Sequence, residues 1–455
     1  MKDSINLSNL QLTRRECLAS SIAAGSMLLP ASVSHGAHAA GTEEIKVALI
    51  GCGGRGSGAA AQALAVGPHV KLWAMADAFS DRLEKSLKAI TAGHSDHNRT
   101  KKKSEFESAI DVPIERRFIG LNAFKQAIDS GADVIIITGP PGFRPQHFEY
   151  AVNAGKHVFM EKPLATDANG VRRILAAAEK SKKTNLKIGV GLQRHHQASY
   201  LEAMRRIHDG QIGRIATMRC FWNGGPPAKT PFMRENLSEL EYQVRNWYFF
   251  DWLSGDHICE QHIHNLDVCN WAKGEHPVSA EGMGGRQVRT GKEYGNIFDH
   301  HAVIYTYADG TKMHSYCRQM PGCQNLVAEQ IEGVDGLAEL SSGKSSITTG
   351  GKYLWRTARR DRNFISPYQE EWNTFIKAVE KDTPYHEAEY AAHSTMTAIL
   401  GRLATYSGRL IKWEDAIKSK KTLTIDAKTW EEPAPIHALK DGSYEIAVPG
   451  ITKVL

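Results

Sequence analysis

The stretch from Ile45 to Gly58 reads I-K-V-A-L-I-G-C-G-G-R-G-S-G and decides the fold of the domain that contains it. Its first six residues are mostly apolar, which predicts a buried strand, and Gly51, Gly53 and Gly56 follow at G-x-G-x-x-G spacing. The first glycine permits a sharp turn, the second lets backbone approach a pyrophosphate, and the third lets the next helix pack closely. The stretch therefore predicts a dinucleotide site at the N-terminus of a helix.

A second strand is expected from Val70 to Ala76, and an aspartate stands at its end. Asp77 follows Gly56 by about 20 residues, the spacing at which a carboxylate accepts hydrogen bonds from the adenosine ribose. Because such a carboxylate also repels a 2′-phosphate, Asp77 favours NAD over NADP. A glycine-rich turn without a ligand, followed by an ordinary aspartate, is the alternative that the stretch alone leaves open.

The composition is that of an ordinary globular protein. The 455 residues are 42% hydrophobic and 23% charged, enough for two or three domains with full cores. The formal net charge of +6 comes from scattered basic residues, so no nucleic-acid partner is expected. No apolar stretch is long enough to cross a bilayer, so no membrane partner is expected either.

The first 39 residues have the features of an export signal. Arg14 and Arg15 precede an apolar run from Ala19 to Leu29, and Ala37-His38-Ala39 offers an A-x-A cleavage site. The pattern resembles a twin-arginine signal peptide, with Cys17 where phenylalanine is more usual. It predicts that the segment is removed and that the mature protein is periplasmic. A basic leader without structure is the alternative.

Export by this route has two consequences for the mature chain. Twin-arginine substrates fold before export, so the nucleotide is expected to leave the cytoplasm tightly bound. Folding in the cytoplasm also argues against an obligatory disulfide framework. Pairing of Cys317 with Cys323 stays open.

Strands and helices alternate over residues 45–165, the expected nucleotide-binding domain. The polar stretch from His94 to Glu107 is interpreted as a solvated loop, and further strands are expected at 133–138 and 157–160. This alternation predicts a doubly wound parallel sheet, whose ligands bind beyond the carboxyl ends of its strands. Four residues lie at those ends: Thr138, Pro140, Glu161 and Lys162.

Three motifs in this region resemble one family of oxidoreductases. They are D-V-I-I-I-T-G-P-P from Asp133, A-G-K-H-V-F-M-E-K-P-L-A at 154–165, and G-V-G-L-Q-R at 189–194. Together they are similar to the glucose–fructose oxidoreductase and inositol dehydrogenase family, written Gfo/Idh/MocA, over roughly residues 45–420. The resemblance implies an NAD-dependent enzyme of carbohydrate metabolism. The residues expected to bind NAD are Gly51, Gly53, Gly54, Arg55, Gly56, Asp77, Thr138, Pro140, His147, Glu161, Lys162 and Arg194.

The pattern changes beyond Arg214 to longer strands, with a hairpin at Asp309-Gly310. It predicts a second, α+β domain over residues 166–420, built on a large, mostly antiparallel open sheet. The resemblance implies that this sheet joins subunits of a homo-oligomer. Helices near 367–406 are expected to return toward the first domain, with Met396, Ile399, Leu400 and Leu403 on one apolar face. Residues 421–455 are interpreted as a tail.

The segment from Trp252 to Asp267 reads W-L-S-G-D-H-I-C-E-Q-H-I-H-N-L-D. On a single helix, spacings of three and four would bring four of its polar side chains to one face: His257, Glu260, His264 and Asp267. Two interpretations compete. His257, Glu260 and His264 suit a metal ion, and the same groups suit acid/base chemistry beside a hydride acceptor.

The family resemblance favours acid/base chemistry without a metal. The family pattern is Asp-x-x-x-His, in which the histidine is the acid/base, and His264 takes that place. Glu260 stands where the family usually has aspartate, and its extra methylene moves the carboxylate by roughly 1.5 Å. By resemblance, His264 is the base, and Lys162 stabilises the developing oxyanion and relays protons. Glu260 is the carboxylate that orients these two side chains.

Three functions fit these features. The first is NAD-dependent oxidation of a hydroxyl on a sugar, glycoside or cyclic polyol, with tightly bound cofactor. The second is glycoside hydrolysis by transient oxidation, elimination, hydration and re-reduction, which consumes no NAD. The third is a sugar-binding protein that keeps the fold without turnover. Lys162, Glu260 and His264 together argue against the third.

Overall fold

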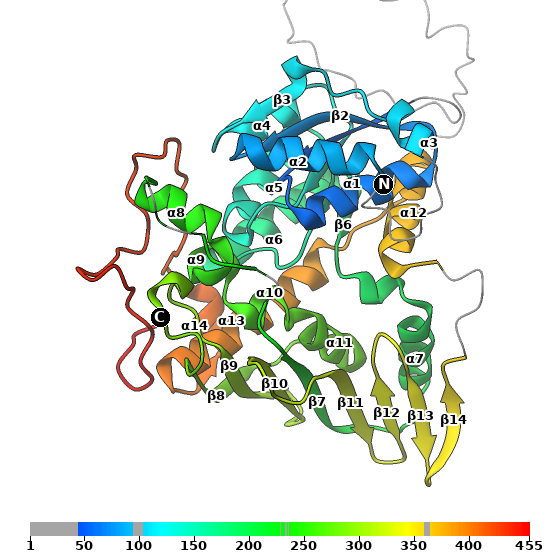
Figure 1. The fold of residues 1–455 in the computed structure, drawn as a ribbon. Helices are drawn as coiled ribbons and strands as arrows, with labels where there is room; N and C mark the ends of the chain where they lie inside the picture. Colours follow the sequence, from blue (N-terminus) through cyan, green and yellow to red (C-terminus); the bar gives the residue numbers. More distant parts are fainter. Residues whose placement is uncertain (1–43, 94–102, 228, 233, 235, 359–364) are drawn as a thin grey trace, which may run out of the picture. The chain divides into compact units, whose positions relative to one another are not determined.

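The computed structural model describes residues 44–455 except 94–102, 228, 233, 235 and 359–364. The predicted export signal over residues 1–39 lies outside the described residues. Two β-sheets organise the rest of the chain (Figure 1).

The first sheet has six parallel strands in the order β3-β2-β1-β4-β5-β6. The order reverses between β1 and β4, as it does in a Rossmann fold, and ligands bind at the carboxyl side of that reversal. This confirms the predicted doubly wound sheet. The strands are β1 (Ile45–Ile50), β2 (Val70–Asp77), β3 (Arg117–Ile119), β4 (Val134–Ile137), β5 (His157–Met160) and β6 (Ile188–Val190).

Helices cover both faces of this sheet. They are α1 (Gly54–Val66), α2 (Ser80–Thr91), α3 (Lys103–Ser108), α4 (Ala123–Asp129), α5 (Arg144–Asn153) and α6 (Ala168–Lys183). The solvated loop expected over 94–107 is wrong in its second half, because α3 begins at Lys103 and buries Phe106 in the sheet's core. The first sheet extends beyond residue 165, because β6 pairs with β5.

The helix α12 (Pro367–Glu380) returns to this first domain from far along the chain. Its Trp372, Phe375 and Ile376 are fully buried with β1 residues such as Val47 in one hydrophobic cluster. In Figure 1, α12 lies beside α1. The helix α12 therefore packs on the first sheet.

The second sheet has nine strands in the order β14-β13-β12-β11-β7-β10-β9-β8-β15. Its neighbours pair antiparallel except β7 and β10, which confirms a mostly antiparallel open sheet. The short strands β12 to β14 were not predicted from the sequence. The strands are β7 (Ile215–Gly224), β8 (Ser279–Gly285), β9 (His300–Thr306), β10 (Lys312–Gln319), β11 (Leu326–Gly333), β12 (Leu337–Leu340), β13 (Ser346–Thr349), β14 (Lys352–Arg356) and β15 (Ile411–Lys412).

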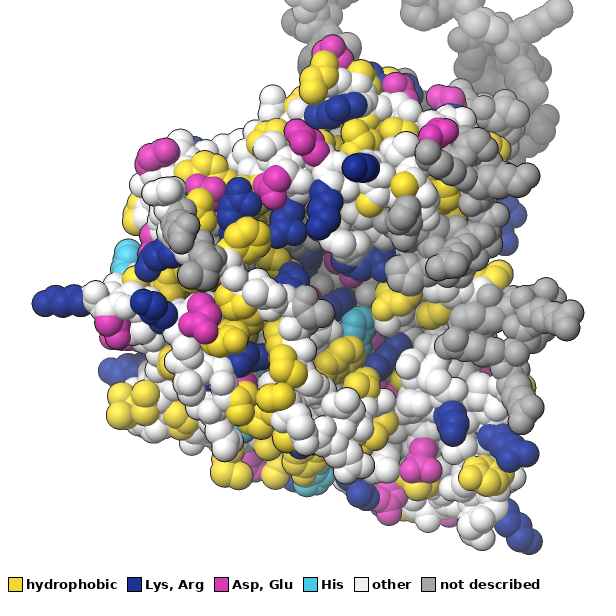
Figure 2. Space-filling view, viewed as in Figure 1, with side chains coloured by type: hydrophobic (Ala, Val, Ile, Leu, Met, Phe, Trp, Pro, Cys, Tyr) yellow, Lys and Arg dark blue, Asp and Glu magenta, His cyan; other side chains and the backbone are white. Residues whose placement is uncertain are grey.

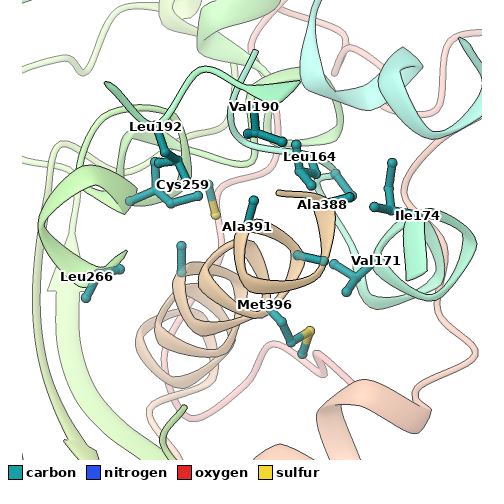
Figure 3. Close-up of a cluster of buried hydrophobic side chains, with 14 of the residues drawn as sticks. Leu164, Val171, Ile174, Val190, Leu192, Cys259, Leu266, Ala388, Ala391 and Met396 are labelled. Atoms are coloured by element: carbon teal, nitrogen blue, oxygen red, sulfur yellow. The ribbon is translucent and has the colours of Figure 1, made fainter. Parts of the chain in front are cut away.

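The helices of this second part are mostly short. They are α7 (Ala198–His208), α8 (Glu239–Arg245), α9 (Asp251–Ser254), α10 (His257–Glu260), α11 (Ile263–Lys273), α13 (Ala388–Ser407) and α14 (Trp413–Lys418). The helix α13 is buried around most of its circumference, so the single apolar face expected for it is wrong. Its Ala388, Ala391 and Met396 pack with Val171 of α6 and Leu266 of α11 (Figure 3). This core ties the second sheet to the first domain.

The tail over residues 421–455 has no helix or strand, yet it packs onto the protein. Ala427, Ala434 and Tyr444 are buried in one hydrophobic cluster with residues of α8 and α9. Among the described cysteines, Cys317 and Cys323 are both unpaired. Within the described residues, no helix has the length and apolar character needed to cross a membrane.

Candidate active site

A cavity of about 1440 Å³ opens at the carboxyl ends of β1, β2, β4 and β5. Its opposite wall comes from the second part of the chain, including Trp222 at the end of β7 and residues of α8. Figure 2 shows the hollow, with Lys and Arg side chains gathered around it and a histidine inside. Crevices at this position are where doubly wound sheets bind nucleotides.

The glycine turn has the geometry that a pyrophosphate needs. Gly51 has φ +94°, and a Cβ there would lie 2.4 Å from the backbone nitrogen of Gly139. A Cβ at Gly56 would lie 2.0 Å from the carbonyl oxygen of Gly51. At Gly53 and Gly54, by contrast, a Cβ would meet no described atom within 4 Å, and no described side chain caps the N-terminus of α1. The turn therefore leaves open backbone where a dinucleotide's phosphates bind.

Asp77 ends β2 at the edge of this turn. Its Oδ2 accepts a hydrogen bond from the Cys52 backbone N–H at 2.6 Å, and its Oδ1 accepts one from Phe79 at 2.9 Å. Burial raises the pKa of this carboxyl, and the two backbone hydrogen bonds oppose that rise. Each oxygen keeps a second lone pair, so the carboxylate can still accept bonds from ribose hydroxyls.

Three residues that follow β4 line the cavity, and their surroundings differ. The Thr138 hydroxyl donates to the carbonyl oxygen of Gly51 at 2.6 Å and so holds the turn itself. Pro140 lines the cavity just beyond it. His147 stacks on Phe124 with ring centroids 4.2 Å apart, and burial, followed by the Arg144 charge, lowers its pKa to about 3. His147 is therefore neutral at pH 7.

Arg144, which was not predicted from the sequence, lines the cavity. The residue is 2% exposed, and its guanidinium donates to the carbonyl oxygens of Gly139, at 2.6 Å, and of Pro163. Burial lowers its pKa to about 10, so it stays charged at pH 7. Its position just after the G-P-P-G break was the only sequence signal for it.

The two charged residues after β5 point to different partners. Glu161 is buried and pairs with Arg55, whose Nε lies 3.2 Å from Oε1, while the Arg55 guanidinium lies over the Tyr368 ring. Lys162 donates from Nζ to the Glu260 carbonyl oxygen at 2.5 Å and lies 3.6 Å from the Glu260 carboxylate. Lys162 and Glu260 both line the cavity.

His264 completes this corner of the cavity. Its side chain is buried, its Nδ1 has no hydrogen-bond partner among the described residues, and the Trp222 ring stacks over it at 5.9 Å. Burial, and then the charges of Lys162 and Arg194, hold the pKa of this imidazole well below its usual value. The ring is therefore neutral at pH 7 and can accept a proton.

The single helix predicted across this segment is wrong. The helix α10 ends at Glu260 and α11 begins at Ile263, so the four predicted side chains do not share a face. Asp267 turns away from His264 and pairs with His195 at 2.8 Å and with the Ser394 hydroxyl at 2.8 Å. The metal set of His257, Glu260 and His264 consequently does not converge.

The group of potential ligands that does converge, within the described residues, is Asp256, His257 and His301. Hydrogen bonds already occupy its carboxylate. Oδ1 accepts from the His257 ring at 3.0 Å, and Oδ2 accepts from the Phe298 backbone at 2.8 Å and from the Tyr406 hydroxyl at 2.7 Å. We interpret this fully buried cluster as a structural anchor for the start of α10.

Arg194, predicted to contact NAD, lines the cavity but is held from the other side. Its buried guanidinium pairs with the Glu329 carboxylate of β11, which also accepts from the Tyr200 hydroxyl at 2.9 Å. The carboxylate neutralises the arginine's charge. Arg194 therefore contributes to the wall near His264 more than to phosphate binding.

This arrangement defines a class: a two-domain, dinucleotide-dependent enzyme with its cavity at the switch point of a Rossmann sheet. Residues 45–190 match the model described as "Oxidoreductase family, NAD-binding Rossmann fold", and residues 200–332 match the "GFO/IDH/MocA C-terminal domain". The inositol 2-dehydrogenase of Klebsiella pneumoniae (strain 342) is 40% identical over 263 residues, which are 55% of this chain and 68% of that protein. The chain belongs to the GFO/IDH/MocA family of oxidoreductases.

Solved structures share the fold at low identity. The aldose–aldose oxidoreductase from Caulobacter crescentus, complexed with glycerol, has TM-score 0.62 and 18% identity, over 81% of this chain and all of the other. A levoglucosan dehydrogenase in complex with NADH and levoglucosan has TM-score 0.62 and 15% identity, over 81% and 99% of the two chains. At this identity the likeness shows the architecture alone.

Proposed function

We propose that the protein oxidises a hydroxyl group of a sugar, glycoside or cyclic polyol and keeps its NAD bound between turnovers, with a second substrate that takes the hydride back from the bound NADH. The observation that carries the proposal is the meeting of Lys162, Glu260 and His264 at one wall of the cavity that also holds the open glycine turn. The family's dehydrogenase relatives favour oxidation over the hydrolytic alternative.

The three side chains divide the chemistry. The neutral His264 imidazole takes the proton of the substrate hydroxyl. The Lys162 ammonium stabilises the negative charge that develops on that oxygen. Glu260 holds the ammonium in place through its carbonyl oxygen and its carboxylate. The nicotinamide, when bound, supplies the hydride acceptor.

We propose NAD rather than NADP as the cofactor. Asp77 supports this, because its carboxylate lies where the adenosine ribose is expected and would repel a 2′-phosphate. Gly53 and Gly54 support a close approach of the pyrophosphate.

Retention of NAD is supported by a clasp at the adenosine end of the cavity. We use this name for Phe79, Arg245 of α8 and Trp430 of the tail. The Trp430 ring stacks on Phe79 with centroids 5.1 Å apart and 13° between planes, and the Arg245 guanidinium lies 3.9 Å from the Phe79 centroid. Since Phe79 and Arg245 line the cavity, Trp430 of the tail packs behind that part of the cavity wall.

Trp430→Ala is expected to speed NAD release about 3- to 10-fold, because a stacked aromatic pair is worth about 0.5–1.5 kcal/mol. The measurement is NAD remaining on the protein after gel filtration, followed over time. Trp355→Ala, a change on β14 at the far edge of the second sheet, is the matched control. Equal release from the two variants would contradict a role for the clasp.

The proposed function is tested by denaturing purified protein and identifying the released nucleotide by mass spectrometry. We expect NAD at close to one per chain. The intact protein is then offered sugars, inositols and glycosides without added cofactor. An oxidised product supports the proposal, whereas a hydrolysed glycoside without net oxidation would replace it with the hydrolase. Released NADP would overturn the role given to Asp77, and folded protein without nucleotide would overturn retention.

We infer periplasmic location and a homo-oligomer as parts of the same proposal. The twin-arginine pattern of residues 1–39 supports export. Exposed apolar side chains on the second sheet, including Met283, Tyr316 and Leu326, support a subunit interface there.

A further inference from the structure

The cavity carries an excess of positive charge. Among the residues that the structure describes, eight lysine and arginine side chains line it against three aspartate and glutamate side chains. Figure 2 shows the same imbalance around the hollow. A bound dinucleotide brings two negative charges in its pyrophosphate, so part of the excess remains for another ligand.

Several of these cations already have a carboxylate partner. Arg55 pairs with Glu161, and Lys162 lies beside Glu260. Arg194 pairs with Glu329 of the second sheet. The partner of Arg245 is Asp81, whose Oδ1 lies 3.3 Å from its NH1. These four cations therefore do not account for the excess.

Lys229 stands out among the remaining cations because of where it enters the cavity. The chain reaches it directly after β7, the strand that carries Trp222, and the Trp222 ring stacks on His264. Lys229 thus belongs to the wall opposite the Rossmann sheet. The Trp222–His264 contact brings this wall against one of the candidate catalytic groups.

The Lys229 ammonium lies on aromatic rings. Its Nζ is 3.6 Å from the Trp247 centroid and 5.5 Å from that of Tyr248, and it makes no hydrogen bond or ion pair with a described residue. Burial lowers the pKa of this ammonium to about 8, and the negative charge of Glu260 opposes that decrease. It therefore stays largely protonated at pH 7 and is free to bind an anion.

We propose that Lys229 binds a carboxylate of the substrate, so that the enzyme acts on acidic sugars such as uronic acids, aldonic acids or their glycosides. The inference rests on the proposed oxidation of a sugar hydroxyl. One ammonium matches the single charge of a carboxylate, whereas phosphates are usually held by several N–H groups together. The aromatic wall of Trp247 and Tyr248 lowers the cost of ordering the lysine before substrate binds.

The test compares matched neutral and acidic sugars on the intact holoenzyme. Glucose is paired with glucuronate and galactose with galacturonate, and binding is followed by calorimetry alongside turnover. We expect the acid of a pair to be preferred in kcat/KM by about tenfold or more, the effect of one charge-assisted hydrogen bond. Lys229→Met should raise KM for the acid about 10- to 100-fold, with kcat and the neutral sugar unaffected. Lys229→Arg should keep most of the preference.

The outcomes separate this inference from the proposed function. Lys352→Met, at an exposed position on β14, is the matched control and should leave the preference intact. Equal use of both sugars of each pair would overturn the acidic-substrate inference while leaving oxidation in place. Loss of bound NAD in Lys229→Met, without a change in preference, would assign Lys229 to the cofactor instead. Sugar-acid binding that is lost in Lys229→Met, in a protein that oxidises nothing, would support the carboxylate site and overturn the proposed function.

Discussion

Lys162→Met is expected to lower kcat for sugar oxidation by about 10²- to 10⁴-fold, while the protein keeps its NAD. Methionine has a similar length but no charge, so the developing oxyanion at the substrate loses its cation. Glu260 loses the partner that holds it, because Lys162 donates to its carbonyl oxygen and lies 3.6 Å from its carboxylate. The measurement is NADH formation in a single turnover, with nucleotide content checked separately.

Lys156→Met is the matched control, because Lys156 precedes β5 at the end away from the cavity. Its turnover should equal that of the unchanged protein. If Lys162→Met kept full turnover with NAD bound, the proposed catalytic role would be abandoned and a binding protein would become the better hypothesis.

The pH profile of the residual turnover of Lys162→Met should also differ from that of the unchanged protein. Burial contributes most to the lowered pKa of His264, and the Lys162 charge adds to it. Removing that charge lets the pKa of the imidazole rise. Because the base must be deprotonated to accept the hydroxyl proton, the acidic limb of the profile should move to higher pH. An unmoved limb would mean that another group is the base.

The parts of the site that could be predicted from sequence are those encoded locally. Gly51 is required by its positive φ and Gly56 by its contact with the Gly51 carbonyl oxygen, both within one strand–turn–helix unit, so their spacing alone shows the turn. Asp77 follows from the length of the next helix and strand. Glu161 and Lys162 sit at the end of one buried strand, where a parallel sheet places its ligands.

The parts that could not be predicted depend on contacts between distant segments. Asp267 has the spacing of a neighbour to His264, yet its oxygens go to His195 and Ser394, which no local pattern could indicate. Asp256 forms its own cluster with His301 of β9 and Tyr406 of α13, two segments far along the chain. Trp430 comes from a stretch rich in prolines and charges, which predicts a tail and not a residue that stacks on the cavity-lining Phe79.

Asp256 is where the structure predicts the largest effect on stability. The residue is fully buried at φ +70°, a conformation that side chains rarely adopt, and its carboxylate accepts the hydrogen bonds that fix the start of α10. Burial alone would raise the pKa of this carboxyl, but His301 and His257 outweigh it and hold the pKa well below its usual value. Partners from three segments of the chain therefore stabilise the buried carboxylate charge.

Asp256→Asn is expected to lower the free energy of unfolding by about 3–5 kcal/mol, the usual result of breaking a buried charge cluster from one side. Turnover should fall as well, since Asp256 precedes the short helix that presents Glu260 to Lys162. The measurement is a chemical denaturation midpoint with NAD content matched. Tyr406→Phe, which removes one hydrogen bond to the same carboxylate, should cost only about 1 kcal/mol.

The same cluster fixes the direction of the pH dependence. Because the folded-state pKa of Asp256 is depressed, its contribution to stability is present above the unfolded pKa of about 3.9 and is lost as the pH falls through the folded value. The difference in stability between the unchanged protein and Asp256→Asn should therefore be full at pH 7 and shrink on acidification below about pH 4. A difference independent of pH would show that Asp256 acts through shape alone, and Asp256→Gly, which relaxes the backbone, would then be the less damaging change.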